Sequence, residues 1–167
     1  MAFTPSDGTG LAAANSYADQ AFADAYLLDR GVAAWASLTD ADKEAALVRG
    51  TDYIDAVYGH RVKSATLVDS DVQALRFPTV SDGLPDRVKQ AAVVAANLES
   101  QGLDLLPSVG AGARVKRERV EGAVEVEYFN TPAGMPYVAL PEVDRLMRRY
   151  LGAGGYYGTG VKPLLRG

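Results

Sequence analysis

The stretch "QALRFPTVSDGLPDRVKQAAVVAANLES", residues 73–100, decides the predicted fold. It places an aromatic–proline step, Phe77-Pro78, ahead of a loop, a second proline and an alanine-rich run. Because proline restricts the residue before it to extended conformations and suits the first turn of a helix, we predict a rigid Phe77 and then a helix over about 85–101. Its predicted buried stripe comprises Val88, Ala91, Ala92, Ala95 and Leu98. The small alanine side chains would let another helix approach closely.

Two helices are predicted before this stretch, over about 17–30 and 40–58. Each follows a hydroxyl residue that has aspartate three positions later, Ser16 in the first case and Thr39 in the second, as in a capping box. The predicted stops are Gly31 and Gly59. In the first helix, helical spacing relates Phe22, Ala25, Tyr26 and Asp29. In the second, one face carries Leu47, Thr51, Ile54 and Tyr58.

A long connection and one more helix complete the predicted helical part. Residues 60–84 carry no helical pattern, and a loop of this length is usually functional or packed by its own side chains. Leu75 and Phe77 are its expected apolar anchors. Pro141 opens a fourth predicted helix, over about 141–151. The apolar positions of that helix are Val143, Leu146, Met147 and Tyr150.

The segment "RVKRERVEGAVEVEYF", residues 114–129, alternates as a β-hairpin does. A register with Val120 opposite Val124 would give opposite-charge cross-strand pairs, Arg119 with Glu125 and Arg117 with Glu127. A two-residue loop would instead place Glu118 against Glu125, and Gly122 suits neither turn well, so the register stays open.

The C-terminal segment, residues 152–167, is rich in glycine, which disfavours a stable helix. It nevertheless carries apolar anchors, which solvent-facing tails usually lack. We expect an extended tail that docks onto a partner, the alternative being a tail that folds back onto its own domain. The predicted fold is therefore mainly α: about four helices in a small bundle over 1–151, with a β-hairpin insertion and an extended tail.

The composition of the chain limits the classes of function that it could have. The chain has 167 residues, 48% hydrophobic and 23% charged, as in an ordinary globular domain. It has no cysteine, which excludes disulfides and thiolate metal sites. A net charge of −4 gives no overall attraction to nucleic acid or anionic membrane. No apolar run could span a bilayer and no secretory signal is found, so we expect the protein to be made in the cytoplasm.

No group of residues has the pattern of a catalytic, cofactor or metal site. The single histidine, His60, has no evident nucleophile or acid beside it. The sequence "GTGLAA", 8–13, lacks the preceding strand of a dinucleotide site, and "DADKE", 40–44, lacks the glycine of a calcium loop. Asp52 and Asp55 share a helix face that we expect to be solvated. We therefore predict no enzymatic activity, no cofactor and no metal.

The order of the motifs is informative. "DGTG" with "ANSY", "KEAALVRGTDYID", "QALRFP", the basic-then-acidic hairpin and a terminal "KPLLRG" follow one another along nearly the whole chain. In this order they resemble the head–tail connector, or adaptor, proteins of tailed double-stranded DNA phages, in a subgroup labelled DnaT-like ssDNA-binding proteins. Members commonly carry Trp before the proline and Arg after it, where this chain has Phe77 and Thr79.

This resemblance implies a virion neck protein without enzymatic activity, assembled in the host cytoplasm. Copies would form a ring, typically a dodecamer, beneath the portal protein, extending the DNA channel and meeting a downstream neck or tail-terminator protein. The residues expected to dock onto the portal are Tyr156, Tyr157, Val161, Leu164 and Leu165. The residues that could contact channel DNA non-specifically are Arg114, Lys116, Arg117 and Arg119. Pairing of these cations with the hairpin's own glutamates is the other interpretation.

A second hypothesis is a single-stranded DNA-binding replication accessory protein, as the subgroup label suggests. The net charge of −4 and the balanced charges of the hairpin disfavour it. Tight, salt-sensitive binding of single-stranded DNA would support it.

Overall fold

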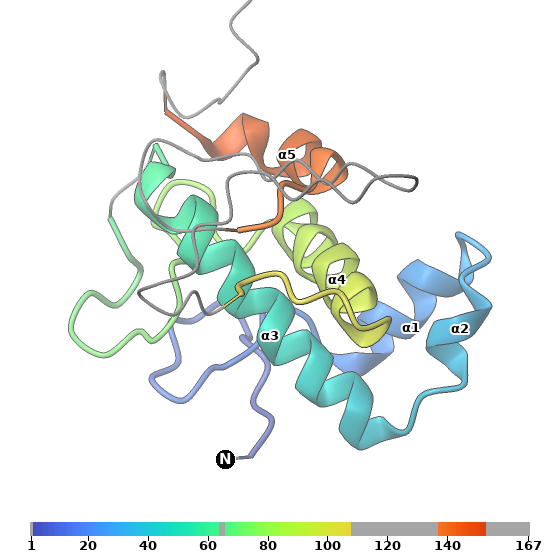
Figure 1. The fold of residues 1–167 in the computed structure, drawn as a ribbon. Helices are drawn as coiled ribbons and strands as arrows, with labels where there is room; N and C mark the ends of the chain where they lie inside the picture. Colours follow the sequence, from blue (N-terminus) through green and yellow to red (C-terminus); the bar gives the residue numbers. More distant parts are fainter. Residues whose placement is uncertain (1, 64–65, 108–136, 153–167) are drawn as a thin grey trace, which may run out of the picture. The chain divides into compact units, whose positions relative to one another are not determined.

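The computed structural model describes residues 2–63, 66–107 and 137–152 (Figure 1). The chain divides into two compact units, one of residues 1–103 and 140–167 and a small one of residues 104–139. The described helices all belong to the larger unit: α1 (Gln20–Leu28), α2 (Ala33–Ala36), α3 (Asp40–Tyr58), α4 (Asp86–Ser100) and α5 (Pro141–Met147), with the 3₁₀ turns η1 (Gly59–Arg61) and η2 (Arg148–Tyr150).

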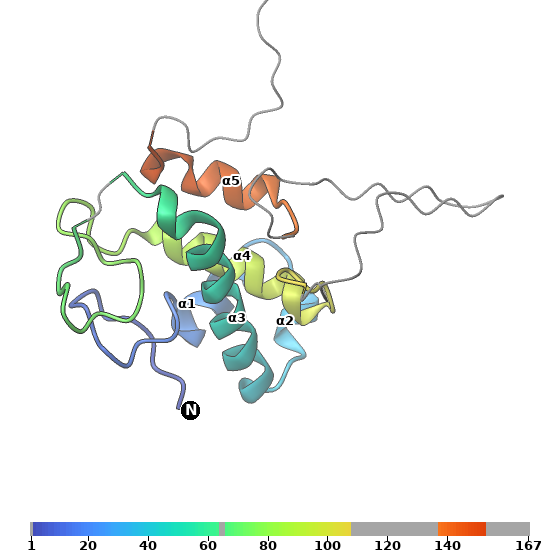
Figure 2. The ribbon, with the colours of Figure 1, turned by 60° about the vertical axis from the view of Figure 1, so that its left-hand side comes forward.

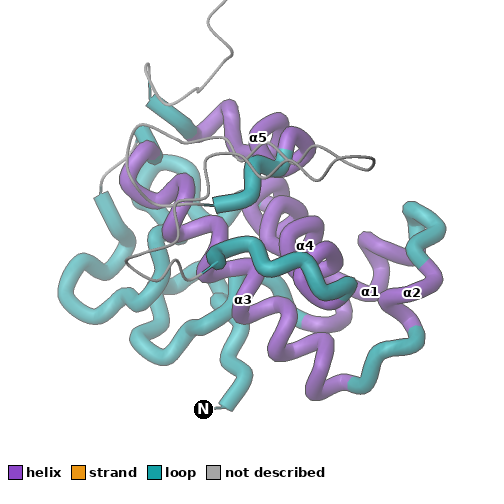
Figure 3. Tube along the Cα trace, in the orientation of Figure 1, coloured by secondary structure: helices purple, strands orange, loops and turns teal. Residues whose placement is uncertain are grey.

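The prediction of a mainly helical fold is confirmed. Within the described ranges no strand is present, and four isolated β-bridges are the nearest approach to one (Figure 3). The predicted β-hairpin at 114–129 lies outside the described residues, as does the predicted tail beyond Gly152, and the described part gives the hairpin no support. In the small unit, Val138 N donates a hydrogen bond to Leu105 O. No helix in the described part of the chain is long and apolar enough to cross a membrane.

Helices α3 and α4 form the centre of the larger unit, and Figure 2 shows them crossing closely. The crossing is close because Gly50 faces Ala92 and Ala96, with no side chain between the backbones. A Cβ atom added at Gly50 would lie 2.5 Å from Ala92 O. The predicted close approach at an alanine-rich helix is therefore confirmed, and Pro85 occupies the N-cap of α4, one residue ahead of its first turn.

The start of α1 corrects one prediction. Ser16 is not the N-cap, because Ser6 N donates to Ser16 O and this pairing holds Ser16 against the N-terminal arm. The helix begins later, where Asp19 Oδ1 accepts a hydrogen bond from Phe22 N at 2.7 Å. The buried face of α1 comprises Ala23, Tyr26 and Leu27.

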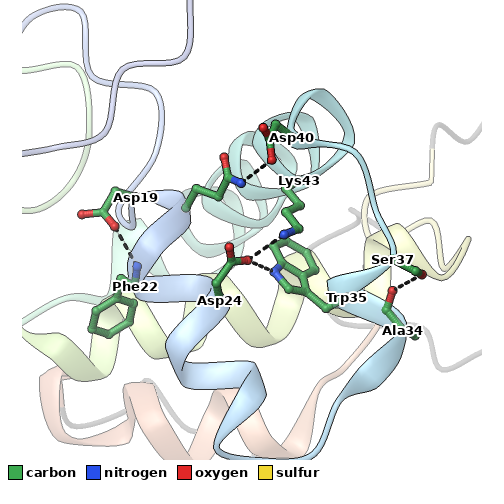
Figure 4. Close-up of polar contacts among 9 residues, drawn as sticks. Asp19, Phe22, Asp24, Ala34, Trp35, Ser37, Asp40 and Lys43 are labelled. Carbon is green, nitrogen blue, oxygen red and sulfur yellow. Dashed lines mark hydrogen bonds and ion pairs between the residues drawn. The ribbon is translucent and has the colours of Figure 1, made fainter.

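Helix α2 was not predicted, and one carboxylate links it to both neighbouring helices (Figure 4). Asp24 of α1 accepts a 2.7 Å hydrogen bond from the indole Nε1 of Trp35 in α2. The same oxygen, Oδ1, lies 3.0 Å from Lys43 Nζ of α3. Both Trp35 and Lys43 are buried, so Asp24 compensates a polar group and a charge that packing removes from water.

Helix α5 packs on α4 and begins at Pro141, as predicted. Its predicted apolar positions are all buried. It is also tied to α3, because Tyr58 Oη donates a 2.6 Å hydrogen bond to Asp144 Oδ1. The ring of Tyr150, in η2, meets that of Phe77 edge-on.

The long connection is packed by its own side chains, as predicted. Leu75 and Phe77 are buried, and the peptide bond between Phe77 and Pro78 is cis. The amide Nε2 of Gln73 donates to Leu75 O at 2.7 Å and to Pro78 O at 2.9 Å. This side chain therefore holds the loop closed around its apolar anchors.

Candidate nucleic-acid interface

Two segments with basic residues, from distant parts of the sequence, lie together in the larger unit. One group comes from η1 and the residues after it, the other from η2. We call this set the basic corner, and it comprises His60, Arg61, Lys63, Arg148 and Arg149. These two segments follow directly on the ends of α3 and α5, which lie side by side in Figures 1 and 2.

Main-chain pairing fixes the two segments of the basic corner against each other. Val62 and Leu151 form an antiparallel bridge. Lys63 N donates to Tyr150 O at 2.8 Å, and Gly152 N donates to Arg61 O at 2.9 Å. Because Val62 and Leu151 are both buried, the bridge is anchored in the core and the charged residues on either side of it are brought to the surface.

The charges of the basic corner are largely solvent-facing. His60, Lys63, Arg148 and Arg149 are exposed, and Arg61 is half-buried with its guanidinium 5.5 Å above the ring of Tyr58. Lys63 Nζ donates to the main-chain carbonyl O of Arg149 at 3.0 Å, so the Lys63 ammonium group lies against the main chain of η2. Among the described residues, no carboxylate lies within 4 Å of the Lys63 or Arg149 cation.

The described part of the larger unit presents few aromatic faces for base stacking. Its largest aromatic side chains belong to the core: Tyr17, Tyr26, Trp35, Tyr53, Tyr58, Phe77 and Tyr150. Phe22, which is half-buried, stacks on Tyr26. Any contact with nucleic acid at the basic corner would therefore rest on charge and hydrogen bonding to phosphates rather than on aromatic stacking.

Asp55 is a structural carboxylate rather than part of a solvated face, which corrects our expectation. Its Oδ2 accepts a 3.0 Å hydrogen bond from Arg76 N, and its Oδ1 accepts a short one from Tyr17 Oη. Phe77 N in turn donates to Tyr17 Oη at 3.2 Å. Burial raises the pKa of Asp55 above its ordinary value, although the hydrogen bond from Tyr17 lowers it. Asp52 remains exposed.

A shallow groove lies beside the basic corner, with a volume of about 490 Å³. Asp55, Gly59 and His60 line one side of it, at the end of α3 and in η1. The connection lines the other side with Leu67, Gln73, Ala74, Leu75 and Arg76. His60 belongs both to the groove and to the basic corner.

The other candidate motifs have structural roles. Residues 8–13 follow no strand and enter no helix, which excludes a dinucleotide fingerprint there. In the segment 40–44, Asp40 and Asp42 lie in the first turn of α3, where Thr39 Oγ1 accepts from Asp42 N. Among the residues described, no three side chains of metal-ligating type cluster together. The predicted docking residues of the tail and the cations of 114–119 lie outside the described residues.

The sequence model of one protein family matches residues 1–166, and its description is "Putative DnaT-like ssDNA binding protein". No curated protein and no solved structure gives a significant match. The match corrects our assignment to the head–tail connectors. It covers nearly the whole chain and names single-stranded DNA binding, and nothing in it names a virion neck component.

Proposed function

Because the chain belongs to the family of DnaT-like single-stranded-DNA-binding proteins, we propose that it binds single-stranded DNA, with the basic corner contacting the phosphates. The observation that carries the proposal is the convergence of two basic segments at the bridge between Val62 and Leu151. In a chain with a net charge of −4, attraction to a polyanion needs such a local cluster.

The chemistry of the basic corner suits phosphate groups. Arginine offers a planar fork of donors that matches two phosphate oxygens, whereas lysine acts as a compact charge. The cluster joins three arginines and one lysine, namely Arg61, Lys63, Arg148 and Arg149. Such contacts follow the backbone and read no base sequence.

The strength of this binding should depend steeply on salt. A single strand releases about 0.7 counterions for each phosphate neutralised, so four cations predict a slope of roughly −3 in a plot of log affinity against log salt concentration. The rest of the chain is acidic on balance. Its repulsion of DNA is strongest at low salt, where screening is least, and therefore makes the slope somewhat shallower. Binding should still be clear at low salt and weak at high salt.

A second contact is proposed for the predicted β-hairpin at 114–129. If Arg114, Lys116, Arg117 and Arg119 face the same strand of DNA, they would lengthen the phosphate path and make the salt slope steeper. If they pair with the hairpin's own glutamates instead, the slope would stay near the value for the basic corner alone.

The test measures binding of a fluorescein-labelled thymidine strand by anisotropy over a series of salt concentrations. Replacing Lys63 and Arg149 together by glutamine should make the salt slope shallower by about 1.4, because two of the phosphate contacts are lost. The matched control replaces Arg30 and Arg87, two exposed cations outside the basic corner, by glutamine. Equal losses in the two double variants, or no binding by the unaltered protein at low salt, would refute the proposal.

A further inference from the structure

We propose that the groove beside the basic corner holds one nucleotide of the bound strand, with its phosphate toward His60 at the rim and its base against the apolar wall. This inference rests on the proposed DNA-binding function and extends it from phosphate contact to contact with a base.

The size and chemistry of the groove fit such a unit. Its volume of about 490 Å³ lies within the range of small-ligand sites in proteins, about 300–1,000 Å³. Leu67, Ala74 and Leu75 supply apolar surface for a heterocycle. His60 supplies a nitrogen donor at the rim, as a phosphate requires.

Hydrogen bonds within the protein hold the walls of the groove. Asp55 accepts from Arg76 N at 3.0 Å, which joins the connection to α3, and both residues line the groove. Gln73 clamps the loop through Leu75 O and Pro78 O, and its Oε1 accepts from Asp69 N at 3.3 Å. Walls held by such contacts spend less of the binding free energy on ordering side chains.

The arrangement of charge orients the nucleotide. Both carboxylate oxygens of Asp55 already accept hydrogen bonds, and its negative charge would repel a phosphate placed near them. The phosphate therefore belongs at the rim, near His60. From there the next phosphates along the strand can reach Arg61 and Lys63, which follow His60 in the chain.

The experiment compares two labelled single strands of equal length, one of thymidine and one that keeps the sugar–phosphate backbone but has no bases. A binding site for phosphates alone holds both strands equally. A groove that also holds a base should bind the thymidine strand roughly tenfold more tightly, a ratio within reach of one buried apolar contact.

A variant of the groove tests whether the groove causes the tighter binding of the thymidine strand. Replacing Ala74 by leucine should fill the apolar wall and remove the preference for the thymidine strand, while binding of the abasic strand stays unchanged. Ala74 is exposed, so the core is untouched. The control replaces Ala45, an exposed alanine of α3 that does not line the groove, by leucine, and should keep the preference.

The outcomes separate this inference from the function on which it rests. Equal binding of the two strands by the unaltered protein overturns the groove and leaves phosphate binding standing. A preference that survives in the Ala74→Leu variant also overturns the groove, because the base would then be held elsewhere. If neither strand binds at low salt, the proposed function itself is wrong.

Discussion

Replacing Gly50 by alanine should destabilise the protein, although alanine is the better helix former. Gly50 lies within α3, where it faces α4. An added Cβ would lie 2.5 Å from Ala92 O and 2.7 Å from Ala96 N, both closer than real Cβ contacts. These are main-chain atoms, so they cannot rotate away as the end of a long side chain would. The two helices must separate to make room.

The size of the effect follows from two opposing contributions. The higher helix propensity of alanine stabilises an exposed helical site by about 1 kcal/mol relative to glycine. Overpacking of a close interface usually costs about 1–3 kcal/mol, and a clash with rigid main-chain atoms belongs at the upper end or beyond it. We expect a net loss of about 1–3 kcal/mol in the free energy of unfolding. In a chain of this size each kcal/mol lowers Tm by roughly 2–4 °C.

Urea unfolding followed by circular dichroism measures this loss. The controls replace Ala45 and Ala56, exposed residues of the same helix, by glycine, and each should lose about 1 kcal/mol, which calibrates the propensity contribution in α3 itself. If Gly50→Ala instead gains the amount that the controls lose, then α3 and α4 do not approach as closely as the structure has them, and the reasoning fails.

Two further predictions concern buried polar groups. Replacing Asp24 by alanine should lower the free energy of unfolding by about 1–3 kcal/mol in urea unfolding, because the Lys43 charge and the Trp35 N–H lose their acceptor. Replacing Lys43 by methionine should cost less, because that change removes the charge itself. Burial raises the pKa of Tyr17 well above its ordinary value of 10.0. The unfolded chain therefore releases this proton first, so the free energy of unfolding should fall as pH rises past about 10, and the fall should be shallower in Tyr17→Phe. An equal slope in that variant would show that other groups control alkaline unfolding.

Helix bounds could be predicted wherever local chemistry sets them. Thr39 caps α3 through its own side chain and Gly59 follows the last residue of that helix, so both signals lie within one turn of the ends they specify. The predicted start of α1 was wrong because a residue outside the helix determines where it begins. Ser6 pairs with Ser16, and no local signal reports that pairing.

The candidate site could not be predicted for the same physical reason. The sequence "HRVK" ending at Lys63 and the pair ending at Arg149 are each too short to stand out, and they lie about 86 residues apart. Asp55 looks like a surface residue by helical periodicity, yet partners far along the chain, Tyr17 and Arg76, enclose it. Periodicity reports which residues share a face and says nothing of which loop covers that face.

One buried side chain links the core to the proposed binding surface. Tyr58 is the last residue of α3. Its hydroxyl donates a hydrogen bond to Asp144 of α5, and its ring lies below the guanidinium of Arg61. This hydrogen bond adds to the bridge between Val62 and Leu151 in holding the two halves of the basic corner together. A cluster of like charges gains nothing for folding by itself, since its members repel one another, and core contacts such as those of Tyr58 must offset that repulsion. Cations that are held together despite their mutual repulsion are what we expect of a surface that binds a polyanion.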